Sequence, residues 1–219
     1  MTIVKDILGF YNKDTGEEML TYDVVRELCG EVAASTTGNW LPANCVSLSA
    51  VGDEYVFKII HKCERLKISV EVNRSYEDDD GNEQTETEMH NYNLPCHNLF
   101  FSIAATKHGD NYIVNTKDTL LSMFIGEFTP TATLYDFPYG NVYDDGHICW
   151  GAIGIGALRF KDYELGAVAS MFLSSEFNND LTSLIADGRD DVYEVYDDFD
   201  GKESLDVSYL NVTSRTVKG

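Results

Sequence analysis

The sequence predicts one α+β domain built around an antiparallel sheet, and three observations lead to this prediction. Short apolar runs separated by turn residues follow one another through the first half of the chain, as antiparallel strands do. Apolar residues recur at helical spacing near both ends. Finally, 43% of the 219 residues are hydrophobic, with 13 Tyr and 11 Phe, which supplies a core and excludes a chain that is disordered throughout.

The N-terminal part begins with a predicted strand over Thr2–Phe10. Thr21 is a suitable helix cap, and the apolar residues after it keep helical spacing, so a helix is predicted from there to about Gly38. The strands expected next are Asn44–Val51, Glu54–His61, Leu66–Asn73, Leu99–Ala105 and Tyr112–Val114. Gly52-Asp53, between the first two of these strands, predicts a tight hairpin turn.

The C-terminal half contains fewer regular patterns. The stretch Leu134–Ile155 is rich in Pro, Gly, Tyr and Asp, which predicts an irregular but ordered segment. Helical spacing returns over Glu164–Phe172 and again within Asp187–Asp200. The remaining residues, Gly201–Gly219, are expected to add one strand and a loose tail.

Acidic residues dominate the charge of the chain, with 37 Asp and Glu against 16 Lys and Arg and a net charge of −21. This balance excludes non-specific binding to nucleic acid and disfavours anionic membranes, because both need clustered basic residues. Seven acids lie in Glu77–Glu88 and nine in Asp187–Asp206. We therefore predict a single domain over residues 1–219 whose core covers about 20–180, with an acidic loop at 77–90 and an acidic extension at 187–219.

The cysteines indicate a reducing compartment. Their number is odd, they are widely scattered, and none forms a CxxC pair: Cys29, Cys45, Cys63, Cys96 and Cys149. The first residues lack the basic and apolar regions of a signal peptide, and no apolar run reaches the roughly 18 residues of a membrane span. The expected localisation is the cytoplasm, with no membrane partner.

Acidic stretches do not by themselves make a calcium site. Asp78, Asp80 and Gly81 match the middle of an EF-hand loop, but Tyr76 and Thr87 occupy the end positions where ligands are required. Zinc is no better supported, and no glycine-rich phosphate loop is present. The sequence therefore predicts neither a metal nor a cofactor.

One segment, Tyr139–Trp150, stands out from this background. Asp144-Asp145-Gly146 predicts a turn that exposes the residues after it, and Cys149 comes shortly after this turn and before several glycines. Asn141 precedes Cys149 by eight residues, on the other side of the turn, where its amide can donate to an oxyanion formed at a cysteine thioester. The alternatives are a buried, inert Cys149, and a hydrolase that pairs Cys149 with one of the five histidines.

This segment resembles the active-site stretch of ubiquitin-conjugating (E2) enzymes, because Asn141, Gly146, Ile148 and Cys149 match that motif in register. The surrounding sequence is similar to prokaryotic E2 family D, which includes protein B of the PRTRC cassettes of plasmids and phages. The smaller matches extend from about Trp40 to Asp180: Trp40-Leu41-Pro42-Ala43-Asn44, Leu94-Pro95, Phe100, Thr131–Pro138 and Ala169–Asp180.

The resemblance implies an E2-like fold, in which an N-terminal helix precedes an antiparallel meander and further helices follow. It implies a thioester-forming Cys149 and an oxyanion-donating Asn141. Tyr139-Gly140 stands where the motif has His-Pro, and Trp150 where it has Leu, so we expect Tyr139 and Trp150 to contribute to binding. The implied partners are a ThiF-like activating enzyme (E1), a small β-grasp ubiquitin-like protein and a JAB-type protease.

The leading hypothesis is thus a carrier of a ubiquitin-like modifier in such a bacterial, plasmid or phage cassette. Two other functions stay open from the sequence. The chain is either an E2-like module that binds without catalysis, or an acidic structural or decoy protein that engages basic partners through its charge.

Overall fold

The computed structural model describes residues 41–42, 44–78, 81–177 and 192–217, with the backbone alone for residues 73–75. It also describes the backbone of three short antiparallel strands, β1 Ile3–Lys5, β2 Phe10–Asn12 and β3 Glu18–Met19. The predicted strand over Thr2–Phe10 coincides with β1 and the start of β2, and its residues 6–9 lie outside this description. The helix predicted from Thr21 to Gly38 lies wholly outside it.

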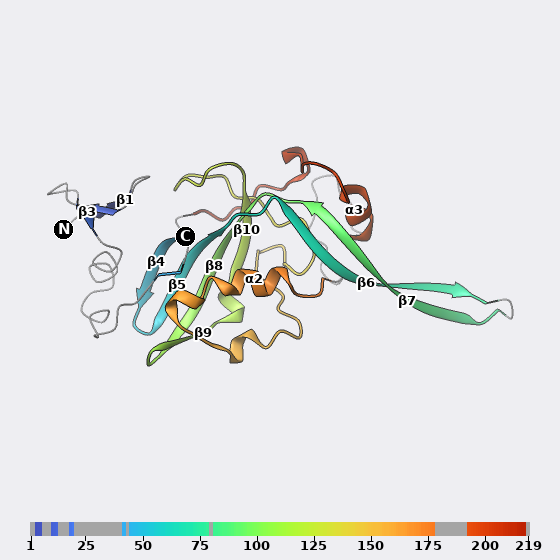
Figure 1. Ribbon diagram of the computed structural model, residues 1–219, viewed down its shortest axis with the longest axis horizontal. Coiled ribbons are helices and arrows are strands. Elements are labelled where there is room, and N and C mark those ends of the chain that lie inside the picture. The colour runs from blue at the N-terminus through green and yellow to red at the C-terminus, as the bar shows by residue number, and fades with distance from the viewer. Residues whose placement is uncertain are drawn as a thin grey trace.

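An antiparallel sheet of six strands forms the body of the molecule, which confirms the predicted α+β plan (Figure 1). Its strands are β4 Cys45–Val51, β5 Glu54–His61, β8 Asn98–His108, β9 Asn111–Val114, β10 Leu120–Phe124 and β11 Arg159–Phe160. The long strand β8 organises the sheet. It pairs with β5 along one edge, and with β10 and then β9 along the other.

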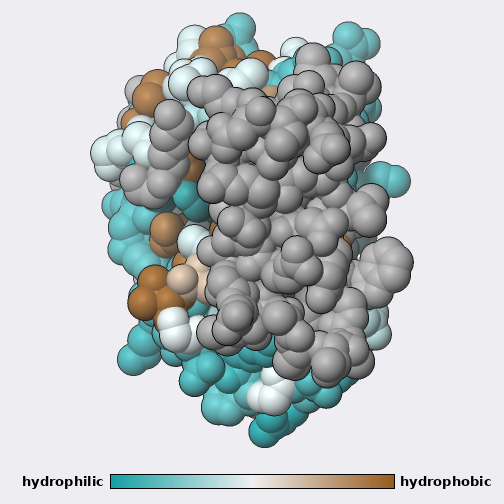
Figure 2. Space-filling model, turned by 90° about the vertical axis from the view of Figure 1, so that its left-hand side faces the viewer, coloured by the Kyte–Doolittle hydropathy of each residue, from teal (hydrophilic) through white to brown (hydrophobic). Residues whose placement is uncertain are grey.

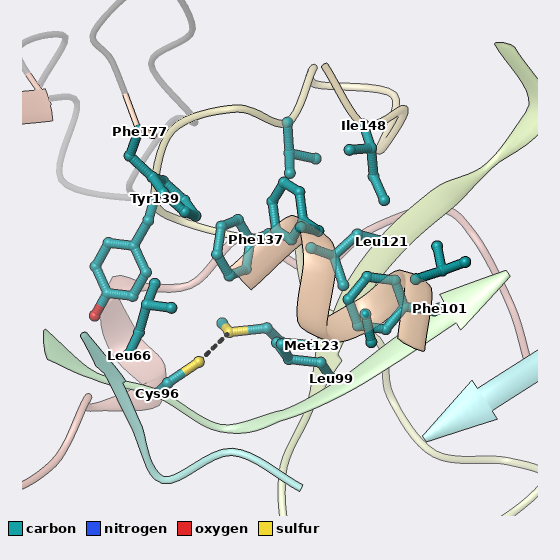
Figure 3. Close-up of a cluster of buried hydrophobic side chains, with 14 of the residues drawn as sticks. Leu66, Cys96, Leu99, Phe101, Leu121, Met123, Phe137, Tyr139, Ile148 and Phe177 are labelled. Carbon is teal, nitrogen blue, oxygen red and sulfur yellow. Dashed lines mark hydrogen bonds between the residues drawn. The ribbon is translucent and has the colours of Figure 1, made fainter. Parts of the chain in front are cut away.

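Alternation of side chains determines which face of this sheet is buried. Because successive residues of a strand point to opposite faces, Tyr55 and Phe57 of β5 face the same side as Phe101 and Ile103 of β8. These side chains form the main core together with the irregular segment after β10, and Figure 3 shows part of it around Phe101. The predicted strands of the first half are confirmed where the structure describes them, as is the Gly52-Asp53 turn.

Two helices in the C-terminal half complete the core. Helix α2, Ala167–Leu173, lies across the inner face of the sheet and buries Phe172 completely (Figure 1). Helix α3, Val192–Phe199, buries residues spaced three and four apart, as one face of a helix does: Val192, Val195, Tyr196 and Phe199. Both helices agree with the spacing in the sequence.

A long two-stranded ribbon projects from the body (Figure 1). It consists of β6 Arg65–Glu77 and β7 Glu83–Pro95, which pair antiparallel over their full 13 residues each. Near the body the ribbon contributes buried residues such as Val70 and Leu94 to the core. The sequence allows the acidic stretch to be either a solvated hairpin tip or a loop. The part from Glu83 onward is paired strand, with acidic side chains that remain in water.

Like charges face each other at the outer end of this ribbon. Glu77 is the direct cross-strand neighbour of Glu83, an arrangement that destabilises a strand pair. Replacing Glu83 by lysine is expected to slow amide hydrogen exchange in the outer ribbon by about two- to fivefold, the equivalent of one favourable cross-strand pair. Glu83→Gln, which removes only the repulsion, should give a smaller change. Equal exchange rates in the parent and Glu83→Lys would contradict this prediction.

The segment after α3, residues 200–217, packs against the body and is called the C-terminal segment below. Its backbone pairs with the chain beyond β10, since the amide of Asp136 donates to the carbonyl of Asn211 at 3.0 Å and that of Thr213 to Leu134 at 3.0 Å. Lys58 Nζ donates to the carbonyl of Val217 at 2.6 Å. The predicted strand there is reduced to one isolated bridge, and residues up to 217 are held rather than loose.

Figure 2 views the molecule from the end opposite the ribbon. Around the grey atoms, which belong to residues outside the description, the visible surface is largely hydrophilic with scattered apolar residues. Among the described residues, no helix has the length and apolar character needed to cross a membrane.

Candidate active site

Residues 141–149 form a short hairpin, called the Cys149 hairpin here. The amide of Cys149 donates to the carbonyl of Asn141 at 2.8 Å, and the amide of Tyr143 donates to His147 at 2.9 Å. Between these bonds, Val142 and Ile148 form an antiparallel bridge. The eight-residue spacing of Asn141 and Cys149 therefore places the two residues directly opposite each other.

The hairpin is attached to the sheet through its apolar face. Val142 and Ile148 are 2% and 3% exposed and contribute to the core, where Figure 3 shows Ile148. The amide of Ile148 donates to the carbonyl of Thr119 at 3.3 Å, and that of Leu121 to Gly146 at 2.8 Å. Because side chains alternate along a strand, the opposite face carries Tyr143, His147 and Cys149.

The turn of this hairpin is where the sequence predicted it. Gly146 has a φ of +85°, a left-handed conformation that favours glycine, and its amide donates to the carbonyl of Tyr143 at 2.7 Å. The Asp145 carboxylate accepts from the backbone amide of His147 at 3.1 Å and contacts His147 Nδ1 at 2.8 Å. These bonds, the one from the backbone amide first, lower the pKa of Asp145.

Cys149 is partly exposed and opens onto a groove of about 510 Å³. The groove is lined by Thr116, Lys117, Tyr143, His147, Ile148, Cys149, Trp150, Gly151, Ile153, Gly154, Gly156 and Ala157. Hydrogen bonding to Cys149 raises the pKa of Tyr143. The thiol is therefore accessible from the groove and has one tyrosine hydroxyl beside it.

Asn141 lies next to Cys149 through its backbone, but its side chain points elsewhere. The residue has a φ of +66° and is 6% exposed. Its Nδ2 donates to the carbonyl of Glu176, just beyond α2, at 2.7 Å. In this arrangement the amide fixes the hairpin against the segment that follows α2. Its predicted role as an oxyanion donor requires the amide to turn from Glu176 toward Cys149.

The two residues expected to contribute to binding have different surroundings. Tyr139 is fully buried and its hydroxyl donates to the carbonyl of Pro95, so it lies in the core and away from the groove (Figure 3). A binding role for Tyr139 stays a prediction that would require the core to open. Trp150 lines the groove, is 7% exposed, and its Nε1 has no hydrogen-bond partner among the described residues.

Sequence reasoning missed three residues of the site. Tyr143 and His147 alternate with the core residues of the hairpin, so the turn at Gly146 together with strand periodicity was the signal that could have found them. Arg215 comes from the C-terminal segment, and its guanidinium contacts both the turn and Asp136. No local pattern links Arg215 to the hairpin.

The described part of the chain contains no group of three or more His, Cys, Asp or Glu side chains that could hold a metal ion. The other described cysteines have different surroundings from Cys149. Cys96 is buried, and hydrogen bonding to Cys63, followed by desolvation, raises its pKa. The same hydrogen bond lowers the pKa of Cys63, which makes that half-buried thiol the chief rival nucleophile.

Comparison with known proteins gives one match. The model of the family described as prokaryotic E2 family D matches residues 25–198, which include the sheet, the ribbon, the Cys149 hairpin and most of α3. No curated protein and no solved structure matches the chain significantly. Since the match spans most of the 219 residues, the chain belongs to prokaryotic E2 family D.

Proposed function

We propose that the chain carries a ubiquitin-like protein as a thioester on Cys149 and passes it to an acceptor. The observation that carries this proposal is the partly exposed Cys149 thiol at the end of a hairpin held on the core, facing an open groove. Membership of an E2 family makes a ubiquitin-like modifier and an activating enzyme the expected partners. A ThiF-like E1, a β-grasp modifier and a JAB-type protease are the specific candidates.

The chemistry asked of Cys149 is thiol–thioester exchange. The sulfur attacks the thioester carbonyl on the activating enzyme, a new C–S bond forms, and the thiol of the activating enzyme leaves. Because the donor arrives already energised, positioning matters more than the resting reactivity of the thiol. Beyond Cys149 the groove provides room for an extended chain, since a Cβ placed on Gly151 or Gly154 meets no atom within 4 Å.

Trp150 and Asn141 supply candidate donors for the acyl group. The indole N–H of Trp150 has no hydrogen-bond partner among the described residues, and a carbonyl of the bound modifier would satisfy this buried donor. Asn141 would stabilise the oxyanion once its amide leaves the Glu176 carbonyl. Release of that bond on binding would couple the hairpin to the segment beyond α2.

The orientation of Asn141 also favours a second candidate function, a binding module that docks the modifier without forming a thioester. In that case the hydrogen bond from Asn141 to Glu176 persists when the modifier binds. Both functions place the modifier on the same groove, so covalent charging separates them.

The test is to mix the chain with a ThiF-like activating enzyme, its β-grasp protein and ATP, and to follow adducts by non-reducing electrophoresis. A carrier should give an adduct that thiols cleave. Cys149→Ser should abolish it or convert it to a thiol-resistant oxyester, whereas Cys63→Ser should leave it intact. An adduct lost only in Cys63→Ser would contradict the proposal, and binding without any adduct would establish the second function instead.

A further inference from the structure

We propose that His147, oriented by Asp145, accepts the proton of the attacking amine when the acyl group leaves Cys149. This inference rests on the proposed thioester function and adds the group that makes transfer to an amine efficient. Three features support it: the placement of His147, the partner of its Nδ1, and the cation near this partner.

His147 lies where a proton acceptor is needed. It precedes Cys149 by two residues in the same strand of the hairpin, so both side chains project from the face opposite Val142 and Ile148. Both also line the groove that an acceptor must enter to reach a thioester. The His147 side chain is 36% exposed, so substrate can reach the imidazole.

The hydrogen-bond partner of His147 Nδ1 determines which ring nitrogen can accept a proton. His147 Nδ1 lies 2.8 Å from Asp145 Oδ1, and a carboxylate can only accept, so Nδ1 carries the hydrogen. In a neutral imidazole Nε2 then has the lone pair and can take a proton. The same carboxylate oxygen accepts from the His147 backbone amide at 3.1 Å, which fixes the carboxylate against the ring. This is the arrangement of a base oriented by an acid.

The C-terminal segment places a cation near Asp145. Arg215 attracts Asp145 electrostatically, and its Nη2 lies 2.8 Å from Asp136 Oδ1 in a pair whose side chains are 17% and 27% exposed. The guanidinium also packs directly on Gly146 at the turn. Arg215 lies outside the residues 25–198 that the family model matches.

Atoms and electrons balance in the proposed step. The neutral amine attacks the thioester carbonyl, a C–N bond forms, and the C–S bond breaks with its electron pair on the Cys149 sulfur. The proton lost by the amine nitrogen goes to His147 Nε2, and the Asp145 carboxylate stabilises the resulting imidazolium. That proton then passes to the Cys149 thiolate, which restores the neutral imidazole. The products are an amide and the free thiol.

The experiment loads the thioester chemically, so it does not depend on an activating enzyme. S-phenyl thioacetate transfers its acetyl group to thiols of the full-length chain, Cys149 among them. Mass spectrometry of the Cys149 peptide then follows transfer of this acetyl group to glycinamide. The parent is expected to discharge to glycinamide faster than the variants that lack the His147 imidazole. Asp145 contacts His147, and the titratable side chains of Tyr143, Cys149 and Lys117 line the same groove.

Removing the imidazole should slow discharge. His147→Gln is expected to lower the rate constant by about 100-fold, the lower range for general base catalysis. In His147→Ala, added imidazole should restore part of the rate, which a purely structural defect would not allow. Asp145→Asn should slow discharge less. His108→Gln, which changes an exposed histidine on β8, serves as the matched control.

Equal discharge rates in the parent and His147→Gln would overturn the role of His147. Loss of rate in His147→Ala without rescue by imidazole would also overturn it, because the effect would then be structural. The electrophoresis test and the discharge test can fail separately. If no modifier thioester forms but the His147 variants still slow acetyl discharge, the carrier function is contradicted and the proton-accepting role remains.

Discussion

Gly146→Ala is expected to lower the free energy of unfolding by about 2–4 kcal/mol, which combines the strain of a left-handed residue with the loss of a half-buried ion pair. A Cβ at this position would lie 1.5 Å from Nη1 of Arg215 and 2.2 Å from its Cζ. The guanidinium would therefore have to leave the turn and its contact with Asp136. Urea denaturation followed by circular dichroism measures the change.

Gly126→Ala is the control for Gly146→Ala. Gly126 has a φ of +74°, close to the +85° of Gly146, but a Cβ there meets nothing within 4 Å. It should show the backbone strain alone, about 1–2 kcal/mol. Combining Gly146→Ala with Arg215→Ala should cost less than the sum of the two single changes, because the clash is then absent. Equal costs for the two glycine replacements would show that the contact with Arg215 is dispensable.

Phe172→Ala is expected to cost about 3–5 kcal/mol, the range for deleting a fully buried aromatic ring. Phe172 is 0% exposed and joins the sheet, the irregular segment and the groove through ring contacts with centroids 5.5–6.2 Å apart: Phe177, Phe137, Phe101 and Trp150. Thermal and urea unfolding measure the loss. Because the change removes the ring that packs against Trp150, the fluorescence of Trp150 should also change in the folded variant.

Tyr163→Ala provides the comparison for Phe172→Ala. Tyr163 lies just before α2 and is 55% exposed, so the loss of its ring should change stability by less than about 0.5 kcal/mol. A similar small cost for Phe172→Ala would contradict the central place of that ring in the core.

Periodicity predicts the parts of this fold in which one face is buried. Phe57 and Phe101 lie in short apolar runs in β5 and β8, and Val195 keeps helical spacing in α3, so these elements could be recognised from the sequence. Strand β7 was missed because its outer half has water on both sides and thus carries polar residues at every position. In this outer half the strand is held by pairing with β6, and backbone pairing leaves no hydrophobic periodicity in the sequence.

The site was predictable to a similar extent. The glycine turn and the spacing of Asn141 and Cys149 are local features, and the hairpin follows from them. The direction of the Asn141 amide depends on the Glu176 carbonyl, 35 residues later in the chain, and the turn depends on Arg215 from the C-terminal segment. Contacts between residues so far apart arise from tertiary packing, which a single sequence does not encode in any local pattern.

The acidic side chains of the ribbon have a consequence for self-association. Among the described residues no further strand pairs with the ribbon, and such open edges invite strand addition by a second copy. Two ribbons placed edge to edge would bring acids such as Glu83 and Glu86 of each copy together, which repel at low ionic strength. The charges that weaken the tip therefore protect it from aggregation, and salt, which screens them, weakens that protection.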